Sequence, residues 1–183
     1  KKEFTIEDAN EDGRVLLHYG ASDWETDVYV NGSHVGKHRG GYDPFTFDIT
    51  EYVKSSGSQE IVVTVWDPTD KGAQPVGKQT HNPRNIWYTP VTGIWQTVWL
   101  EYVPETYIKD IKITPDIDNN RVKLEVDAKN AASSHVIKAV VADNGDRVNS
   151  VTEFHGNRLF VNIEDPKLWS PNNPFLYDLE LIL

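Results

Sequence analysis

A regular alternation of apolar and polar residues is the feature that most constrains the fold of this chain. In Arg121–Asp127, three apolar residues alternate with four charged residues, so an extended strand would place the two sets on opposite faces. Helical periodicity is nearly absent. Similar strand-like runs occur at Glu60–Trp66, Val98–Tyr102, Leu159–Ile163 and Tyr177–Leu183, with a shorter apolar run at Arg14–His18. The pattern predicts an all-β protein.

Short turn signals separate these runs. Asn31-Gly32 lies between two alternating segments and predicts a hairpin with a type I′ turn, because Asn and Gly tolerate positive φ angles. Asn144-Gly145 and His155–Asn157 predict further turns. Many short strands at intervals of about 8–12 residues are typical of β-sandwiches. No strand–helix alternation occurs, so a (β/α)₈ barrel is not expected within this sequence.

A break bounded by proline divides the chain. Val103-Pro104-Glu105 follows a run rich in large residues and precedes a new strand that begins at Ile108. We therefore expect two domains, one spanning residues 1–103 and the other residues 104–183. The second domain has the size of a small seven-strand sandwich.

Composition excludes several classes of function. The net charge of −10 disfavours nucleic acid and anionic lipid as partners, because a surface this acidic repels phosphate groups. No apolar run is long enough to insert into a membrane. The absence of Cys excludes disulfides and thiolate metal sites. The chain also lacks Met, even at position 1, so we expect an excised piece of a longer protein.

The long segment Asp67–Gly93 has many Pro and Gly residues and no usable periodicity. Loops of more than about 12–15 residues within a compact domain are usually functional or disordered. This one combines aromatic rings with hydrogen-bonding groups, which favours a site for a polar ligand over disorder. The candidate binding residues are His81, Arg84, Trp87 and Tyr88.

No catalytic or metal site is evident from the residues alone. The sequence has 28 acidic residues, and any two of them could be chosen as a catalytic pair, so spacing alone identifies none. The sequence has no G-x-S-x-G elbow, no P-loop and no dinucleotide fingerprint. His34 and His38 are expected on one face of a strand about 13 Å apart, which is too far to share a metal. We expect no cofactor.

Three blocks of sequence resemble glycoside hydrolase family 2, which includes β-galactosidases, β-glucuronidases and β-mannosidases. The blocks appear in the family's order. The first two, Asp27–Thr50 and Trp87–Glu101, are similar to the family's N-terminal sugar-binding domain, and the third, Leu168–Leu179, is similar to the end of the following immunoglobulin-like domain. By eye the chain is nearest to β-galactosidase-like members.

Much of these blocks also has a structural interpretation. Gly40-Gly41 permits a bulge or a close backbone approach, and Pro44 favours an extended entry into the next strand. Asp48–Val53 predicts a short helical turn capped by Thr50. The sequence predicts core or interdomain positions for Trp95, Trp99 and Trp169.

The resemblance implies a jelly roll followed by an immunoglobulin-like sandwich, with both catalytic glutamates of a retaining glycosidase in a downstream barrel beyond Leu183. The chain would then hold no catalytic residue, and its partners would be that barrel and, through the parent enzyme, a carbohydrate. The family's first strands are expected upstream of Lys1. Family members that act on dietary or plant glycans are often exported, so the resemblance is compatible with a periplasmic or secreted parent.

Three functions remain open. The chain is an accessory region that supports the barrel and shapes its entrance, a carbohydrate-binding module that acts alone, or an immunoglobulin-like adhesion or assembly protein. His81, Arg84, Trp87 and Tyr88 would contact sugar in either of the first two cases. Their alternative role is to stabilise the loop, with the Trp87 ring pinned against its own domain.

Overall fold

The computed structural model describes residues 1–6 and 13–183. The chain divides between Pro104 and Glu105 into two compact units, the first unit (Lys1–Pro104) and the second unit (Glu105–Leu183). Both units are built from β-strands, and the helical elements among the described residues are two short 3₁₀ turns. No described helix has the length and apolar character needed to cross a membrane. The all-β prediction is confirmed.

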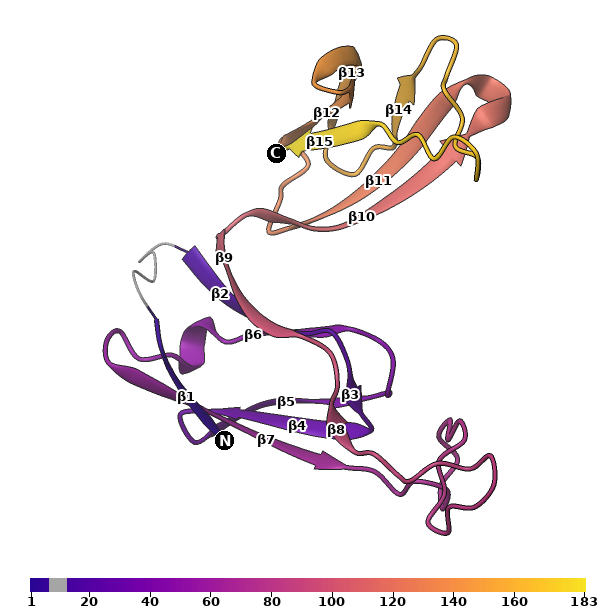
Figure 1. The fold of residues 1–183 in the computed structure, drawn as a ribbon. Helices are drawn as coiled ribbons and strands as arrows, with labels where there is room; N and C mark the ends of the chain where they lie inside the picture. The colour runs from indigo at the N-terminus through magenta and orange to yellow at the C-terminus, as the bar shows by residue number, and fades with distance from the viewer. Residues whose placement is uncertain (7–12) are drawn as a thin grey trace. The chain divides into compact units, whose positions relative to one another are not determined.

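The first unit is a β-sandwich of two main sheets with a small third pair of strands (Figure 1). The four-stranded sheet has the order β1-β7-β4-β5 and the three-stranded sheet has the order β6-β2-β9, while β3 pairs with β8. The bounds are β1 Lys2–Thr5, β2 Gly13–Tyr19, β3 Ser22–Asp23, β4 Glu25–Val30, β5 Ser33–Arg39, β6 Phe45–Asp48, β7 Ser58–Trp66, β8 Gly93–Ile94 and β9 Val98–Pro104, with a 3₁₀ turn at Thr50–Tyr52.

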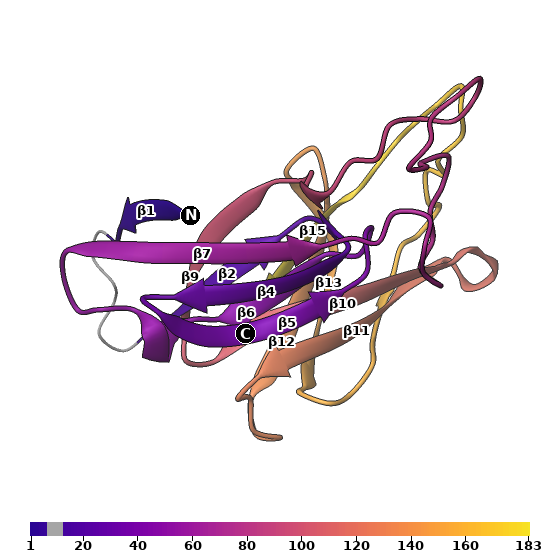
Figure 2. The same cartoon turned by 90° about the horizontal axis from the view of Figure 1, so that it is seen from below.

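The core of the first unit lies between the two main sheets. Its buried side chains come from alternate positions of β2 and β4, together with Ile49. Leu17 and Tyr19 of β2 are each 1% exposed, and Val28 and Val30 of β4 are fully buried. Figure 2 shows β7, β4 and β5 side by side in the four-stranded sheet, in agreement with their pairing. Alternation along the sequence thus places one face of each strand in the core.

The predicted hairpin joins β4 to β5, and its Asn31 and Gly32 both have positive φ angles. One detail of β5 differs from the sequence prediction. Tyr29 is paired with His34 but Val28 is paired with Gly36, so Val35 is an extra residue that forms a bulge.

The bulge reverses the side-chain alternation in the rest of β5. His34 lies on the outer face and bonds to Asp27 (2.8 Å), whereas His38 lies on the inner face and stacks on Phe45. The prediction that His34 and His38 share a face is therefore wrong, because a bulge shifts the alternation by one residue.

The predicted turn after β6 is present at Thr50–Tyr52, but its predicted cap is wrong. The N-cap is Ile49, which has no side-chain cap hydrogen bond, and Thr50 is the first residue of the turn. The Asp48 carboxylate accepts hydrogen bonds from the backbone N–H (3.1 Å) and the hydroxyl (2.6 Å) of Thr50. The Thr50 hydroxyl oxygen accepts from the N–H of Val15 (2.9 Å) and so links the turn to β2.

The second unit is a sandwich of two three-stranded sheets, with the orders β10-β11-β14 and β13-β12-β15. It has six strands in place of the seven expected. The bounds are β10 Tyr107–Asp116, β11 Arg121–Lys129, β12 Val136–Asp143, β13 Asp146–Phe154, β14 Leu159–Asn162 and β15 Asp178–Ile182, with a 3₁₀ turn at Ile117–Asn119. Its core lies between the sheets and is formed by residues such as Leu124, Ile137 and Leu159.

Three tryptophans expected in a core or between domains are not core residues. Trp95 is 49% exposed, Trp99 is 45% exposed and Trp169 is 58% exposed. Trp99 stacks on the ring of His18, with the ring centres 4.8 Å apart, and this contact holds it on the sheet surface. The assignment of these rings to a core is wrong, because Trp99 lies on the outer face of β9 and Trp95 and Trp169 lie outside the strands. Their assignment to positions between domains stays a prediction.

Candidate functional site

The candidate site is the segment of residues 67–92 that joins β7 to β8, here called the long loop. It contains no strand, and Figure 1 shows it leaving the end of β7 and returning at β8. Gln79 and Tyr88 form an isolated β-bridge within the loop. The loop is held by a few backbone hydrogen bonds, such as that from the N–H of Tyr88 to the carbonyl of Lys78 (2.7 Å), together with hydrogen bonds of side chains.

Asp67 joins the two ends of the long loop. Its carboxylate accepts from the backbone N–H of Thr69 (2.7 Å) and from the hydroxyl of Thr92 (3.1 Å). Thr69 is 6% exposed and has a φ of 57°, and its carbonyl accepts from the side-chain amide of Gln74 (2.8 Å). The first and last residues of the loop are thus held by one carboxylate.

Asp23, on β3, lies beside this loop base. Its carboxylate is packed so closely against the backbone of Gly41 that a Cβ at position 41 would lie 2.7 Å from Oδ1. Burial raises the pKa of Asp23, and the negative charge of Asp67 raises it further, while a hydrogen bond with Gln79 opposes the shift. Sequence reasoning missed Asp23, since its environment is assembled by residues far away in the chain.

His81 is oriented by Asp70. The carboxylate of Asp70 accepts from the Thr80 hydroxyl (2.6 Å) and from the backbone N–H of His81 (3.2 Å), and it bonds to Nδ1 of the His81 ring. Hydrogen bonds from Thr80 and then from His81 hold the pKa of Asp70 far below its usual value. The carboxylate therefore stays ionised at neutral pH and fixes the direction of the imidazole. The ring borders an open pocket that Trp24, Arg39 and Trp66 also line.

The other three predicted residues lie close together in the same loop. A turn closed by a hydrogen bond from the N–H of Trp87 to the carbonyl of Arg84 (3.0 Å) presents both side chains. The backbone of Tyr88 pairs with that of Lys78 and Thr80. Tyr88 is 61% exposed and Trp87 is 44% exposed, so neither ring is covered by the domain.

Arg84 is exposed, and its side chain forms no ion pair or hydrogen bond within residues 1–6 and 13–183. The structure therefore brings the four predicted residues into one exposed loop. It gives a structural partner to His81 and leaves the guanidinium of Arg84 available to a ligand.

Two further aromatic residues lie near the loop base. The indole N–H of Trp95 donates to the carbonyl of Gly41 (2.7 Å), and the ring meets Tyr42 edge-on at 6.0 Å between ring centres. Tyr42 is 65% exposed. Tyr42 was missed from the sequence, although the two glycines before it marked a close backbone approach.

The exposed side chains of the long loop are suited to binding a ligand. Among the residues that the structure describes, no group of three His, Asp or Glu side chains is arranged to hold a metal ion. Flat exposed rings next to amide, carboxylate and guanidinium groups can cover the apolar face of a sugar ring and bond its hydroxyls.

Comparison with known proteins decides the family. Residues 1–104 match the family model described as "Glycosyl hydrolases family 2, sugar binding domain", and residues 106–183 match the model "Glycosyl hydrolases family 2". The chain belongs to glycosyl hydrolase family 2. The candidate loop lies in the part that matches the sugar-binding domain.

Curated relatives are named either as beta-glucuronidases or as beta-galactosidases. A putative beta-glucuronidase of Formosa agariphila is 33% identical over all of this chain, which covers 22% of that protein. A beta-galactosidase of Thermoanaerobacter pseudethanolicus is 26% identical over all of this chain, which covers 25% of that protein. The family 2 chain thus spans about a quarter of the length of these relatives.

Solved structures have the same fold. The beta-D-glucuronidase of Dictyoglomus thermophilum is 25% identical, with a TM-score of 0.74 over 98% of this chain and 32% of its own. A beta-glucuronidase of Ruminococcus gnavus aligns with a TM-score of 0.80 and 22% identity over 100% of this chain and 32% of its own. The second likeness concerns the fold alone.

Proposed function

We propose that this chain is a non-catalytic N-terminal region of a family 2 glycosidase and that its long loop borders the place where the sugar binds. The whole protein hydrolyses an O-glycosidic bond of a β-glycoside with retention of configuration, using a carboxylate pair in a downstream barrel. The domains are residues 1–103, the jelly-roll sugar-binding domain, and residues 104–183, the immunoglobulin-like domain.

The observation that carries this proposal is the exposure of Trp87 and Tyr88 on a loop that is otherwise held by hydrogen bonds. If these two rings served only to fix the loop to the first unit, they would be buried against that unit. Asp67 and Asp70 supply that anchoring instead. The rings are thus left for contact with a ligand, and His81 and Arg84 supply polar groups beside them.

The interacting carboxylates of Asp23 and Asp67 near the loop support a non-catalytic role. Asp23 and Asp67 resemble an acid–base pair in that the pKa of Asp23 is raised in part by the charge of Asp67. Both groups, however, are engaged within the protein: Asp67 bonds to Thr69 and Thr92, and Asp23 bonds to Gln79. We assign them to positioning the loop.

Two classes of sugar are candidates. The resemblance favours a β-galactoside. The available guanidinium of Arg84 favours a β-glucuronide, because a sugar carboxylate would form a charge-assisted pair with it on a chain of net charge −10. Relatives with both names are found, so the choice depends on binding measurements.

The test uses the 183-residue chain. Hydrolysis of nitrophenyl β-galactoside, β-glucuronide and β-mannoside is assayed, and galactose, glucuronate and mannose are titrated by calorimetry. Neither turnover nor binding is expected from the chain alone if its loop forms only one side of the sugar site. Turnover would overturn the proposal, since it requires a catalytic pair within these residues.

Binding without turnover would instead favour the second candidate, a carbohydrate-binding module that acts alone. The matched variants are Trp87→Ala in the loop and Trp169→Ala in the second unit, because both rings are partly exposed. A module that uses the long loop loses affinity with Trp87→Ala only. Equal loss in both variants would exclude the loop as the binding surface.

A further inference from the structure

The two Asn-Gly pairs of the sequence form equivalent turns in different surroundings. Asn31-Gly32 joins β4 to β5, and Asn144-Gly145 joins β12 to β13. The φ angles are 49° and 83° in the first turn and 50° and 91° in the second, so both turns have a left-handed backbone at both positions. The two turns differ in what holds the Asn side chain.

The side chain of Asn31 is held by distant parts of the first unit. Its Nδ2 donates to the carbonyl of Tyr52 (2.8 Å) and to Oε1 of Gln59 (2.8 Å). Its Oδ1 accepts from the N–H of Glu60 (3.0 Å). Rotation of the Asn31 carboxamide therefore breaks three hydrogen bonds to residues at least 21 positions away in the sequence.

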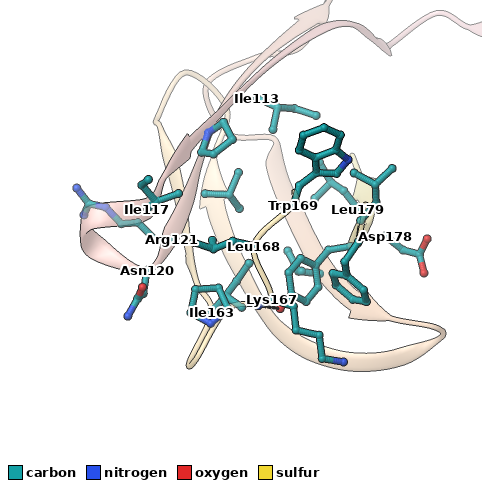
Figure 3. A pocket seen from close by; sticks show the side chains of 17 residues that line it. Ile113, Ile117, Asn120, Arg121, Ile163, Lys167, Leu168, Trp169, Asp178 and Leu179 are labelled. Atoms are coloured by element: carbon teal, nitrogen blue, oxygen red, sulfur yellow. Dashed lines mark hydrogen bonds between the residues drawn. The ribbon is translucent and has the colours of Figure 1, made fainter. Parts of the chain in front are cut away.

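The side chain of Asn144 is held only locally. Within residues 1–6 and 13–183, its Nδ2 donates to the preceding residue, Asp143 (2.8 Å), and it forms no hydrogen bond to a more distant residue. Asp143 also accepts from the ammonium of Lys167, which Figure 3 shows among the side chains around an apolar pocket of the second unit. Rotation of the Asn144 carboxamide therefore breaks one local hydrogen bond.

An Asn-Gly pair can rearrange without an enzyme. The backbone nitrogen of Gly attacks Cγ of Asn, a C–N bond forms, and the side-chain amide leaves as ammonia with the proton of the Gly N–H. Water then opens the cyclic succinimide at either carbonyl and gives aspartate or isoaspartate. The overall reaction is hydrolysis of an amide by water, with no change of oxidation state. Gly favours the attack because it has no Cβ to hinder the approach.

We propose that Asn144 is a site of spontaneous deamidation in the folded chain and that the hydrogen bonds of Asn31 protect the other pair. Attack requires the turn and the carboxamide to leave their native conformation, so the rate follows the free energy of local opening. Three hydrogen bonds against one should make conversion of Asn31 about tenfold slower or more. The inference is independent of the proposed function, since neither turn belongs to the long loop.

Deamidation changes both the charge and the backbone of the hairpin that joins β12 to β13. Either product adds a carboxylate beside Asp143 and Asp146, which already lie opposite each other on the two strands. Like charges in this arrangement are destabilising. Isoaspartate also lengthens the main chain by a methylene carbon, so the two strands can no longer keep this pairing at the turn. Conversion of Asn144 is therefore expected to lower the melting temperature of the second unit.

The test compares the two pairs within one molecule. The 183-residue chain is incubated folded at mildly alkaline pH, and a second sample is incubated in urea at the same pH. Peptide mapping by mass spectrometry follows each Asn, and labelling by a protein isoaspartate methyltransferase detects isoaspartate. Each rate in the folded chain is divided by the rate of the same residue in urea, which removes the effect of flanking residues. This ratio should be about tenfold or more smaller for Asn31 than for Asn144.

The variant Gln59→Leu removes one acceptor of the Asn31 side chain. It is expected to raise the rate at Asn31 by about fivefold or more and to leave Asn144 unchanged. The control Gln74→Leu removes a side-chain hydrogen bond elsewhere in the first unit and should change neither rate. Circular dichroism checks that each variant is folded at the incubation temperature. If Gln59→Leu does not fold, the comparison of the two pairs in the unchanged chain still decides the proposal.

Three results would overturn the proposal. The first is a folded chain in which Asn144 is protected as strongly as Asn31, because the distant hydrogen bonds would then make no difference. The second is conversion of Asn31 at the rate of Asn144. The third is equal acceleration at Asn31 by Gln59→Leu and Gln74→Leu, since the stability of the first unit would then protect Asn31 in place of its own hydrogen bonds.

Discussion

Gln59 is a buried polar side chain whose removal should destabilise the first unit. It lies on β7 and is 1% exposed. Its Oε1 accepts from Asn31 (2.8 Å) and from the N–H of Lys54 (2.8 Å), and its Nε2 donates to the carbonyls of Lys54 (3.2 Å) and Gly57 (3.1 Å). Through Asn31 it also holds the turn between β4 and β5.

The variant Gln59→Leu keeps most of the side-chain volume and removes all four of these bonds. A net hydrogen bond contributes about 0.5–1.5 kcal/mol, and a buried group left without a partner costs about 1–3 kcal/mol. The expected loss of unfolding free energy is therefore about 4 kcal/mol. For a domain of this size, the melting temperature of the first unit should fall by more than about 10 °C.

Unfolding is followed by calorimetry on the whole chain, in which the transition of the second unit serves as an internal reference. The control is Gln74→Leu, which removes one side-chain hydrogen bond, to the carbonyl of Thr69. It should cost less than about 1 kcal/mol. If Gln59→Leu also costs less than about 1 kcal/mol, apolar packing compensates for the lost bonds and the reasoning is refuted.

Three further predictions concern the first unit. Gly36→Ala should destabilise it by about 1–3 kcal/mol in urea unfolding, because a Cβ there would lie 2.4 Å from the Phe47 ring, and Phe47→Leu should restore part of the loss. Burial raises the pKa of Tyr19 to about 12, so folding favours its neutral form. The stability that this neutral form contributes is complete below about pH 10 and is lost as the pH rises toward 12. Tyr19→Phe should therefore remove the loss of stability that ionisation of Tyr19 causes at alkaline pH. Asp67→Asn should lower the pKa of Asp23 in a carboxyl NMR titration without returning it to its ordinary value, because the neighbouring charge is removed while burial remains, and an unchanged pKa would exclude the coupling.

The strands and tight turns were predictable because they depend on neighbouring residues. Alternation locates β7, β11 and β15, and Asn31-Gly32 supplies the two positive φ angles that the hairpin requires. The bulge at Val35 was not predictable, since it arises from how β5 pairs with β4. The same limit applies to the turn after β6, because the Thr50 hydroxyl accepts from the N–H of Val15 on β2, a residue far away in the sequence, and does not cap the turn.

The candidate site was predictable in part for the same reason. A long irregular segment rich in rings and polar groups is visible in the sequence, and the structure exposes His81, Arg84, Trp87 and Tyr88 on it, while their role in binding stays a prediction. The pKa of Asp23 is raised by burial and by the charge of Asp67 and lowered by a hydrogen bond with Gln79, and these residues are brought to it only by the fold. Such long-range environments leave no local pattern.

The groups that surround the exposed rings of the long loop indicate what these rings are suited to bind. In the long loop, Trp87 and Tyr88 lie among carboxylate, imidazole and guanidinium groups, which suits a ligand with both an apolar face and hydroxyls. Trp169 of the second unit is also exposed, but the cations near it, Lys167 and Arg121, are already paired with Asp143 and Asp116. A sugar bound there would lose hydration without recovering hydrogen bonds from these cations. The polar surroundings of an exposed ring, more than the ring itself, therefore indicate which class of molecule it is suited to bind.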